Sequence, residues 1–451
     1  MLDKITELLE TKKYAAIRTL LLEENSADIA EIFEELSDEN LILLFRLLPK
    51  DTASEVFVEM TSDKCETLIR SFSDSELHRI LNELYVDDTV DIIEEMPASV
   101  VKRILKNTDA ETRLAINQIL QYPDDSAGSI MTIEYVDLKK HYTVEHAFSH
   151  IKKTGVDKET IYTSYVTDNE RHLIGVVTAR DLLLADREET IENIMETNVI
   201  SVNTLDDRED VAKLFEKYDF LALPVVDKEG RLVGIVTVDD AIDVINEETE
   251  EDFAIMAGIT PQEKPYLQSS IWRIFLSRVP WLLILMISAT FTGIIITSYE
   301  KALSVYVVLT SFIPMLMGTA GNSSSQSSVT VIRGLSLGEI KFTDMLRVQW
   351  KELRISFLCG ITLAIANFAK LYWFDRLVLG NADITVQVAI IVSITILVAI
   401  VLAKLVGCTL PIIAEKIGFD PAVMASPFIT TIVDALSLLV FFQIAGLFLP
   451  I

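Results

Sequence analysis

A single carboxylate lies in the last long apolar segment of the chain. Asp434 is the only Asp or Glu between positions 427 and 450, and this run can cross the roughly 30 Å hydrocarbon core of a bilayer as a helix. An Asp at the bilayer centre costs about 2.5 to 3.5 kcal/mol, so such acids usually face water, an ion or a partner. Hydrogen bonds to Thr430, Thr431 or Ser437 are the structural alternative, but bonds of this kind average only about 0.6 kcal/mol. Asp434 is therefore predicted to line an ion path.

A second set of carboxylates is concentrated in the first part of the chain. Residues 1–270 have a net charge of −31 and residues 271–451 one of +3, which together give the −28 of the whole chain. This balance argues against nucleic-acid or anionic-lipid binding by the acidic part and favours cations. The acids concerned are Glu55, Asp87, Asp88 and Asp91, then Asp207, Glu209, Glu216, Asp219, Asp240 and Asp243, then Glu247, Glu248, Glu250, Glu251 and Asp252.

These acids have two interpretations. A solvated acidic surface is the simpler one. However, like charges at i,i+4 on a helix repel, and five of the six positions in 247–252 are acidic. Packing that helix against another acidic face would be unfavourable without divalent cations, which is the functional interpretation.

Residues 1–125 are predicted to form a helical-repeat domain. The segment 36–60 matches the segment 72–96, which begins 36 positions later, and each contains a Ser-Asp step typical of a helix N-cap, at Ser37 and Ser73. A period of this length indicates stacked helical hairpins in a small α-solenoid. No 7 to 15 residue apolar core of the signal-peptide kind occurs at the start, so this part is expected in the cytosol.

Residues 126–245 change to a strand-rich pattern with its own repeat. LIGVVTARDLLL at 173–184 recurs as LVGIVTVDDAID at 232–243, a β-branched strand followed by Thr and an acid that opens a helix. These segments resemble two tandem CBS domains of α/β fold. The resemblance implies dimerisation and frequent binding of ATP or another adenine nucleotide, for which Thr178, Arg180 and Asp181 are the candidates; a purely dimerising role is equally open.

Residues 246–270 are predicted to be a connecting helix, and residues 271–451 an all-α membrane domain with five transmembrane helices. The apolar spans lie at about 281–298, 302–318, 355–373, 386–410 and 427–449. The loop after the second span carries Arg333, Lys341, Arg347, Lys351 and Arg354, which places it on the cytosolic side. Five spans then put the C-terminus outside a multi-pass protein of the inner (plasma) membrane.

Two further features accompany the apolar spans. The segment 314–333 is rich in Gly, Ser and amide residues, and is either a plain Gly/Ser loop or a pore mouth at which Gly318, Gly321 and Asn322 approach an ion. Asp420, just before the fifth span, could attract cations or cap a helix. No Walker motif occurs in the sequence, which argues against ATP-driven pumping.

The motifs GNSSSQSSVTVIRG, DPAVMASPFITTIVDAL (420–436) and YPDDSAGSIM (122–131) closely resemble the MgtE family of magnesium channels. The resemblance covers nearly the whole chain in order, from helical N domain through CBS pair and connecting helix to five spans. One departure is the Ser-rich GNSSSQ, where the family more often has a Gly between Asn and Gln. The family implies a homodimer with no enzyme activity, in which the two Asp434 side chains hold a hydrated Mg²⁺.

The same resemblance implies the remaining site residues. Asp420 would serve the ion, and the groups lining the pore would be Asn322, Pro314, Gly321 and Ala425. The sensor ligands for cytosolic Mg²⁺ would be Glu55, Asp87, Asp91, Asp207, Glu209, Glu216, Asp219, Asp240, Asp243, Glu248, Glu251 and Asp252. Mg²⁺ keeps several waters and takes few protein ligands, which suits both kinds of site.

The leading hypothesis is a Mg²⁺ channel that cytosolic Mg²⁺ closes. Ions bridging the acidic surfaces would neutralise their repulsion, compact the soluble part and shut the pore. The alternatives are a proton- or Na⁺-coupled divalent-cation transporter and a non-transporting CBS receptor in the membrane.

Overall fold

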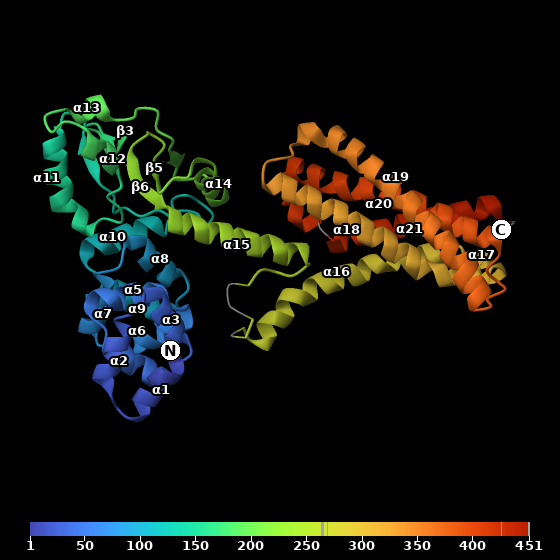
Figure 1. Ribbon diagram of the computed structural model, residues 1–451, viewed down its shortest axis with the longest axis horizontal. Helices are drawn as coiled ribbons and strands as arrows, with labels where there is room; N and C mark the ends of the chain where they lie inside the picture. Colours follow the sequence, from blue (N-terminus) through green and yellow to red (C-terminus); the bar gives the residue numbers. More distant parts are fainter. Residues whose placement is uncertain (263–265, 268, 425, 450–451) are drawn as a thin grey trace. The chain divides into compact units, whose positions relative to one another are not determined.

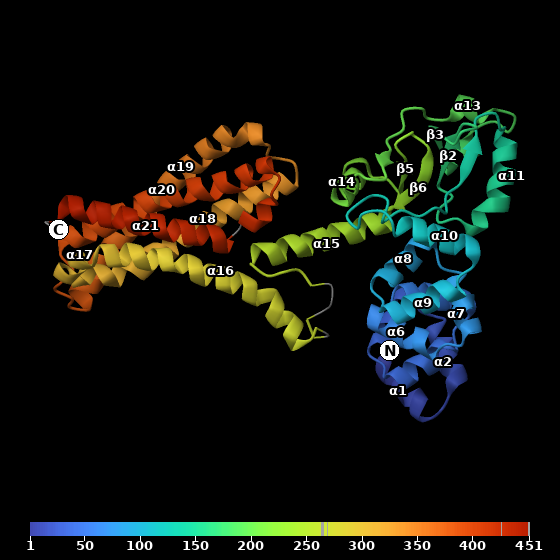
Figure 2. The same ribbon diagram turned by 180° about the vertical axis from the view of Figure 1, so that it is seen from behind.

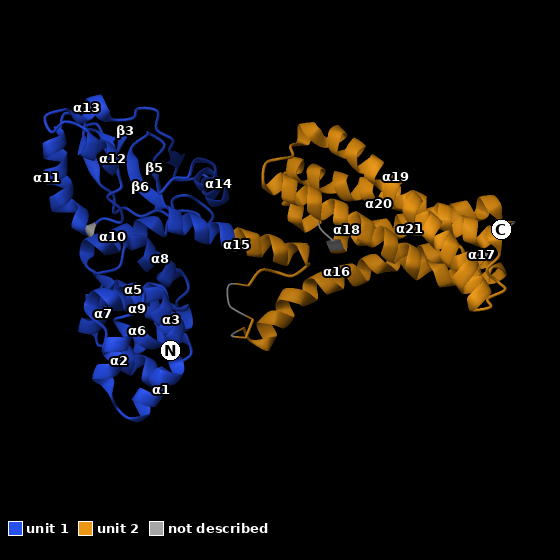
Figure 3. Cartoon of the chain, viewed as in Figure 1, with its two compact units in different colours: residues 1–246 blue, residues 247–451 orange. Residues whose placement is uncertain are grey.

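The chain forms two compact units, residues 1–246 and 247–451, in a computed structural model that describes residues 1–262, 266–267, 269–424 and 426–449 (Figure 3). The first unit combines short helices with two small sheets, and the second is helical (Figures 1 and 2). The predicted sequence of helical, α/β and helical parts is confirmed.

The N-terminal helices repeat every 36 residues. Helices α1, α4 and α7 begin at residues 2, 38 and 74, and the two helices that follow each of them keep the same offset. The repeat unit therefore holds three helices, not the predicted hairpin. Pro49 and Pro97 are the N-caps of α5 and α9, where the chain leaves the preceding helix. The helices are α1 (Leu2–Glu10), α2 (Tyr14–Leu21), α3 (Ser26–Glu34), α4 (Asp38–Phe45), α5 (Lys50–Val58), α6 (Ser62–Ser71), α7 (Asp74–Leu81), α8 (Val86–Glu94), α9 (Ala98–Asn107) and α10 (Ala110–Ile119).

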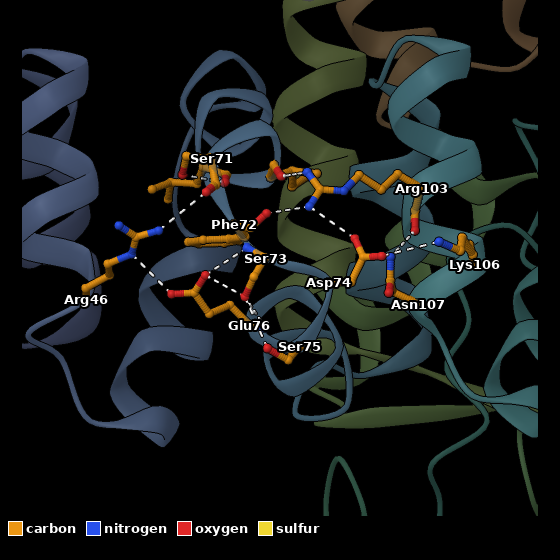
Figure 4. A network of polar contacts seen from close by, with 12 residues as sticks. Arg46, Ser71, Phe72, Ser73, Asp74, Ser75, Glu76, Arg103, Lys106 and Asn107 are labelled. Carbon is orange, nitrogen blue, oxygen red and sulfur yellow. Dashed lines mark hydrogen bonds and ion pairs between the residues drawn. The ribbon is translucent and has the colours of Figure 1, made fainter.

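Polar contacts at the repeat boundary join successive units (Figure 4). Ser37 and Ser73 are N-caps as predicted, and Ser73 forms a full capping box with Glu76. Arg46 of one unit pairs with Glu76 at 3.2 Å. Arg103 of the last unit donates to the backbone carbonyls of Ile69 and Phe72. The repeats thus satisfy backbone carbonyls at the helix ends with side chains from the next unit.

Two three-stranded sheets follow, each ordered parallel then antiparallel. Both end in a Thr-x-x-Asp step that opens a helix. The elements are β1 (Asp137–Lys139), α11 (Val144–Thr154), η1 (Gly155–Asp157), β2 (Thr163–Thr167), β3 (Leu173–Thr178), α12 (Ala179–Leu184) and α13 (Ile191–Ile194), then β4 (Val202–Asn203), α14 (Arg208–Tyr218), β5 (Ala222–Val226), β6 (Leu232–Thr237) and α15 (Val238–Met256). This repeated arrangement is the one expected of tandem CBS domains.

One hydrophobic core runs from the N-terminal helices into the second CBS half. Buried Phe33 and Phe57 of the repeats belong to the same cluster as Phe215 and Val236 beside the second sheet. The first CBS half has a separate core that includes Val166 and Val177. Residues of the N-terminal repeats are therefore fixed relative to those at the start of α15.

The second unit is built around packed apolar helices. Its elements after α15 are α16 (Ile271–Ser298), α17 (Glu300–Val305), η2 (Val307–Phe312), α18 (Ile313–Ser336), η3 (Phe342–Asp344), α19 (Met345–Ala369), the π-helical η4 (Lys370–Val378), α20 (Val386–Ile417), η5 (Pro421–Met424) and α21 (Ser426–Phe448). In the described residues four helical segments are long and apolar enough to cross a membrane: Ile271–Ser298, Phe342–Val378, Val386–Ile417 and Pro421–Phe448.

The second predicted span, 302–318, is misplaced. The chain is broken there into α17 and η2, and a 24-residue helix, α18, begins only at Ile313. The segment 314–333 is thus neither a Gly/Ser loop nor a pore-mouth loop but the body of α18. Hydropathy misses it because its Gly, Ser, Asn and Gln residues dilute the apolar signal, although about 36 Å of helix is enough to cross a bilayer.

Helices α18 and α20 approach each other at backbone distance. A Cβ atom added to Gly407 of α20 would lie 2.5 Å from the Ser324 carbonyl oxygen of α18. We expect Gly407→Ala to separate the two helices and reduce the yield of monodisperse protein, because a backbone atom cannot move aside as a side chain can. Gly446→Ala in α21 is the matched control, since no atom lies within 4 Å of its added Cβ. Equal yields by size-exclusion chromatography would contradict this packing.

Candidate functional site

Asp434 lies on α21 opposite the small-residue helix α18. Its Oδ1 atom is buried and has no hydrogen-bond partner among the described residues. A Cβ atom on Gly321 of α18 would lie 3.8 Å from this oxygen and 2.9 Å from Thr430 Cγ2. Glycine at this position therefore lets α18 approach the carboxylate closely.

Two of the three hydroxyls proposed as structural partners of Asp434 bond elsewhere. Ser437 donates to the Val433 carbonyl at 2.7 Å, and Thr431 donates to the Pro427 carbonyl at 3.1 Å. Both are bonds within α21 itself. Neither hydroxyl therefore satisfies the buried Oδ1 atom of Asp434.

Helix α18 has two contrasting faces. Ser324 and Ser327 are buried in the unit, whereas Pro314, Asn322 and Gln326 are exposed. Exposed amides on a helix of membrane length need water or another chain, because hydrocarbon offers them no hydrogen bond. Of the predicted pore residues, Asn322 and Pro314 share this exposed surface, Gly321 faces Asp434, and Ala425 lies outside the described residues.

Asp420 acts as a local cap. Its Oδ1 accepts a hydrogen bond from the backbone N–H of Ala422 at 2.7 Å, at the start of η5. The side chain is exposed at the end of α21 that precedes Asp434. The capping role predicted for Asp420 is therefore observed, while attraction of cations stays a prediction.

Four carboxylates converge where α8 meets the start of α15 within the first unit. Asp87 of α8 is only 6% exposed, and its Oδ1 accepts the N–H of Asp88 at 3.0 Å. Burial, with the charges of Asp240, Asp88 and Glu159, raises the pKa of Asp87 well above its usual range. Burial, with neighbouring carboxylates adding to it, raises the pKa of Asp88 to about 6, of Asp240 to about 7 and of Glu159 to about 8. We call these four residues the acidic cluster.

The acidic cluster suits a hydrated cation better than a direct cage. One Glu159 oxygen is buried with no hydrogen-bond partner among the described residues. Yet no group of three described His, Cys, Asp or Glu side chains is arranged to hold a metal directly. Mg²⁺ retains several of its waters, through which carboxylates that do not form a direct cage can still bind it. A divalent cation would supply the positive charge that this buried cluster lacks.

Sequence reasoning missed Glu159. It stands in the loop between η1 and β2, and its backbone N–H donates to the Glu134 carbonyl at 2.9 Å. No periodicity or charge run singles it out, because its partners are more than 70 positions away in the sequence. Only the fold brings it to Asp88 and Asp240.

The other predicted sensor acids lie outside this cluster. Asp207 caps α14, Glu209 pairs with Lys213 at 2.8 Å, and Asp219 ends α14 with φ of 55°. Burial and the charge of Asp239 raise the pKa of Asp243. The exposed acids are Glu55, Asp91, Asp207, Glu216, Asp219 and Asp243, while Glu248, Glu251 and Asp252 lie on the part of α15 that belongs to the second unit. Only Asp87 and Asp240 of the predicted ligands therefore meet in the described cluster.

The nucleotide candidates sit at the start of α12. The Thr178 hydroxyl accepts the N–H of Asp181 at 3.2 Å, and Asp181 accepts the Thr178 N–H at 3.0 Å. In the second CBS half, the backbone N–H and the hydroxyl of Thr237 both donate to the Asp240 carboxylate. The Thr-x-x-Asp signature is thus a helix cap first, and Thr178, Arg180 and Asp181 are exposed on its first turn.

The acidic cluster makes the first unit sensitive to pH when divalent cations are absent. A carboxyl whose pKa is raised by folding destabilises the folded state once it is charged. This loss of folding free energy is absent below about pH 4, where the carboxyl is protonated in both states, and grows as the pH rises. With folded pKa values of about 6, 7 and 8, we expect the thermal midpoint of the cytosolic transition to fall between pH 5 and pH 8. Differential scanning fluorimetry of the detergent-solubilised chain in EDTA measures it. Mg²⁺ should remove most of this slope, and a flat profile in EDTA would contradict the cluster.

Family models match most of the chain. The model described as divalent cation transporter matches residues 313–444, the MgtE intracellular N domain matches 24–125, and CBS domains match 127–188 and 191–247. The transporter match begins where α18 begins and includes Asp434. The helical N domain, the CBS pair and the membrane part are thus each assigned independently.

Relatives and solved structures agree with these matches. Magnesium transporter MgtE of Thermus thermophilus is 34% identical over 99% of this chain and 98% of its own length, and that of Bacillus subtilis is 34% identical over 99% and 97%. The crystal structure of the cytosolic domain of the Mg²⁺ channel MgtE in complex with ATP covers 54% of this chain and all of that chain, with 37% identity and a TM-score of 0.52. The soluble part of a magnesium transporter gives 34% identity and a TM-score of 0.51. The chain therefore belongs to the MgtE family of magnesium transporters, which are not enzymes.

Proposed function

We propose that the chain is a homodimeric Mg²⁺ channel whose ion path passes Asp434. The observation that carries the proposal is the buried Asp434 oxygen, which has no hydrogen-bond partner among the described residues and faces Gly321 across the α18–α21 contact. A charged group in this position is stable only if an ion or water reaches it. Mg²⁺ holds its waters tightly, so one carboxylate from each of two copies can bind it through that shell.

The second copy is proposed from the exposed face of α18. Asn322 and Gln326 need water or a polar neighbour at membrane depth. Two copies with these faces toward a common axis would enclose a hydrated path lined by Gly318, Asn322 and Asp434. Pro314 and Ala425 are proposed to complete its ends, and Asp420 to attract cations at the cytosolic one.

Closure by cytosolic Mg²⁺ is proposed to begin at the acidic cluster. A cation there would offset the repulsion among Asp87, Asp88, Asp240 and Glu159 and hold the N-terminal repeats against the first turn of α15. Helix α15 is continuous from Asp240 through Glu248, Glu251 and Asp252 toward the membrane part. Fixing the first turn of α15 would therefore also restrain the part of the same helix that carries Glu248, Glu251 and Asp252. The remaining predicted sensor acids are proposed to bind further, weaker ions.

Nucleotide binding and membrane orientation complete the proposal. The related cytosolic domain was solved in complex with ATP, and Thr178, Arg180 and Asp181 are exposed on the first turn of α12 for such a ligand. Lys341, Arg347 and Lys351 lie between α18 and the apolar part of α19, which supports our proposal that this end is cytosolic and the C-terminus outside.

Electrical recording tests the transport mode. In planar bilayers containing the purified chain, a channel gives Mg²⁺ currents that reverse at the Mg²⁺ equilibrium potential and fall as Mg²⁺ rises on the cytosolic side. A reversal potential that moves with a pH or Na⁺ gradient would instead indicate coupled transport. Mg²⁺ flux into liposomes with no measurable current would also reject the channel.

A further inference from the structure

A buried ion pair joins two membrane helices away from Asp434. Lys404 Nζ of α20 lies 3.7 Å from Glu352 Oε2 of α19, and the two side chains are only 6% and 11% exposed. The Glu352 oxygen is buried and accepts no hydrogen bond from the described residues. Ionisable groups are costly inside a membrane protein and are seldom retained there without a functional use.

Lys404 sits where α20 meets α18. The Ser327 hydroxyl of α18 donates to the Lys404 backbone carbonyl at 3.2 Å. One turn further along α20, Gly407 lies against the Ser324 carbonyl so closely that an added Cβ would be 2.5 Å away. The Lys404 ammonium group thus pairs with α19, while the backbone carbonyl of the same residue accepts a hydrogen bond from α18. At Gly407 the two helices meet backbone to backbone.

The same stretch of α18 leads directly to the ion path. The Ser324 hydroxyl donates to the Gly321 carbonyl at 2.8 Å, and Gly321 faces Asp434. A shift of α20 at Lys404 would therefore be transmitted through backbone contacts to the residue opposite the carboxylate.

We infer that the Glu352–Lys404 pair is a positioning element for Mg²⁺ permeation, which braces α20 so that α18 presents Gly321 to Asp434. The pair acts through the contacts of Ser324 and Ser327 with α20. The inference rests on the proposed path beside Asp434. It adds a charged residue pair, on helices other than α18 and α21, that determines the geometry of that path.

Single and paired substitutions test the brace in proteoliposome flux assays, with rates normalised to monodisperse protein. We expect Glu352→Gln and Lys404→Met each to lower Mg²⁺ flux about tenfold or more and to change the apparent KM, because a site displaced by about 1 Å is loosened. The double variant, which leaves no unpaired buried charge, should recover most of the flux. Lys404→Arg, which keeps the charge, should be milder than Lys404→Met.

The controls separate positioning from stability and from electrostatics. Asn367→Leu removes another α19–α20 contact, the 3.3 Å bond to Ser393, and should lower the thermal midpoint while leaving the normalised flux and KM unchanged. If Glu352→Gln and Lys404→Met lower only the yield, the pair is structural and the inference is wrong. If they change flux in opposite directions, their charges act on the ion directly, which also overturns the brace. Asp434→Asn run in parallel tests the path itself: normal flux in that variant rejects the proposed function, whereas loss there with normal flux in both pair variants rejects only the inference.

Discussion

Replacing Asp434 with Asn is expected to abolish Mg²⁺ uptake while leaving the fold intact. The change keeps the size of the side chain and removes the charge opposite Gly321, where the carboxylate oxygen has no hydrogen-bond partner among the described residues. Losing one partner of a buried charge interaction costs roughly 2 to 5 kcal/mol, so the flux should fall by about 30-fold or more. Mag-fura fluorescence in proteoliposomes measures it directly.

Two further variants sharpen this result. Asp434→Glu keeps the charge but moves it outward by one methylene, so flux should be reduced yet measurable if Mg²⁺ binds through water. Asp383→Asn, an exposed acid in the loop between η4 and α20, is the matched control and should leave flux unchanged. Wild-type flux in a well-folded Asp434→Asn sample would exclude this residue from the path.

Asp434 could be proposed from the sequence because its signal is local. One acid in an apolar run carries a cost that does not depend on the rest of the fold. The Thr-x-x-Asp caps could also be predicted, because a cap involves residues only three positions apart. The 36-residue repeat could be predicted because its copies match along the sequence.

Helix α18 shows where sequence reasoning failed. Its polar residues lower the mean hydropathy, so the apolar segment before it was taken as the span. The helix is stable because Ser324 and Ser327 pack on α20 at backbone distance and its small residues allow α21 to approach. Packing of this kind depends on partner helices, and hydropathy along one chain does not report it.

Glu159 and the Glu352–Lys404 pair were missed for a related reason. Each owes its role to neighbours that the fold brings from distant segments, and neither lies in a motif or a charge run. The predicted sensor set stays a prediction, and charge density along the sequence did not separate a capping acid such as Asp207 from a buried one such as Asp87.

Neutralising Asp87 and Asp240 together should remove the response of the channel to cytosolic Mg²⁺. In the acidic cluster Asp87 is buried and Asp240 half-buried, and this burial together with neighbouring carboxylates raises their pKa values. In Asp87→Asn/Asp240→Asn two of the four carboxylates of the acidic cluster lose their charge, so the repulsion falls and the number of charged ligands for Mg²⁺ is halved. We expect the inhibiting Mg²⁺ concentration to rise about tenfold or more, because ligand charge sets the affinity of such sites. Bilayer currents recorded against cytosolic Mg²⁺ test this.

Glu159→Gln should act in the same direction with a smaller effect, since it removes one charge from the same cluster. Asp74→Asn is the matched control: this exposed acid already pairs with Arg103 and Lys106, so it offers no unpaired charge to a cation. The current measured without Mg²⁺ is a second readout. Removing the repulsion alone favours the compact, closed state and would lower this current. If the double variant is inhibited by the same Mg²⁺ concentrations as the wild type, the Mg²⁺ sensor lies elsewhere. A current that no longer depends on cytosolic Mg²⁺, whatever its size, supports the acidic cluster as the centre of the sensor.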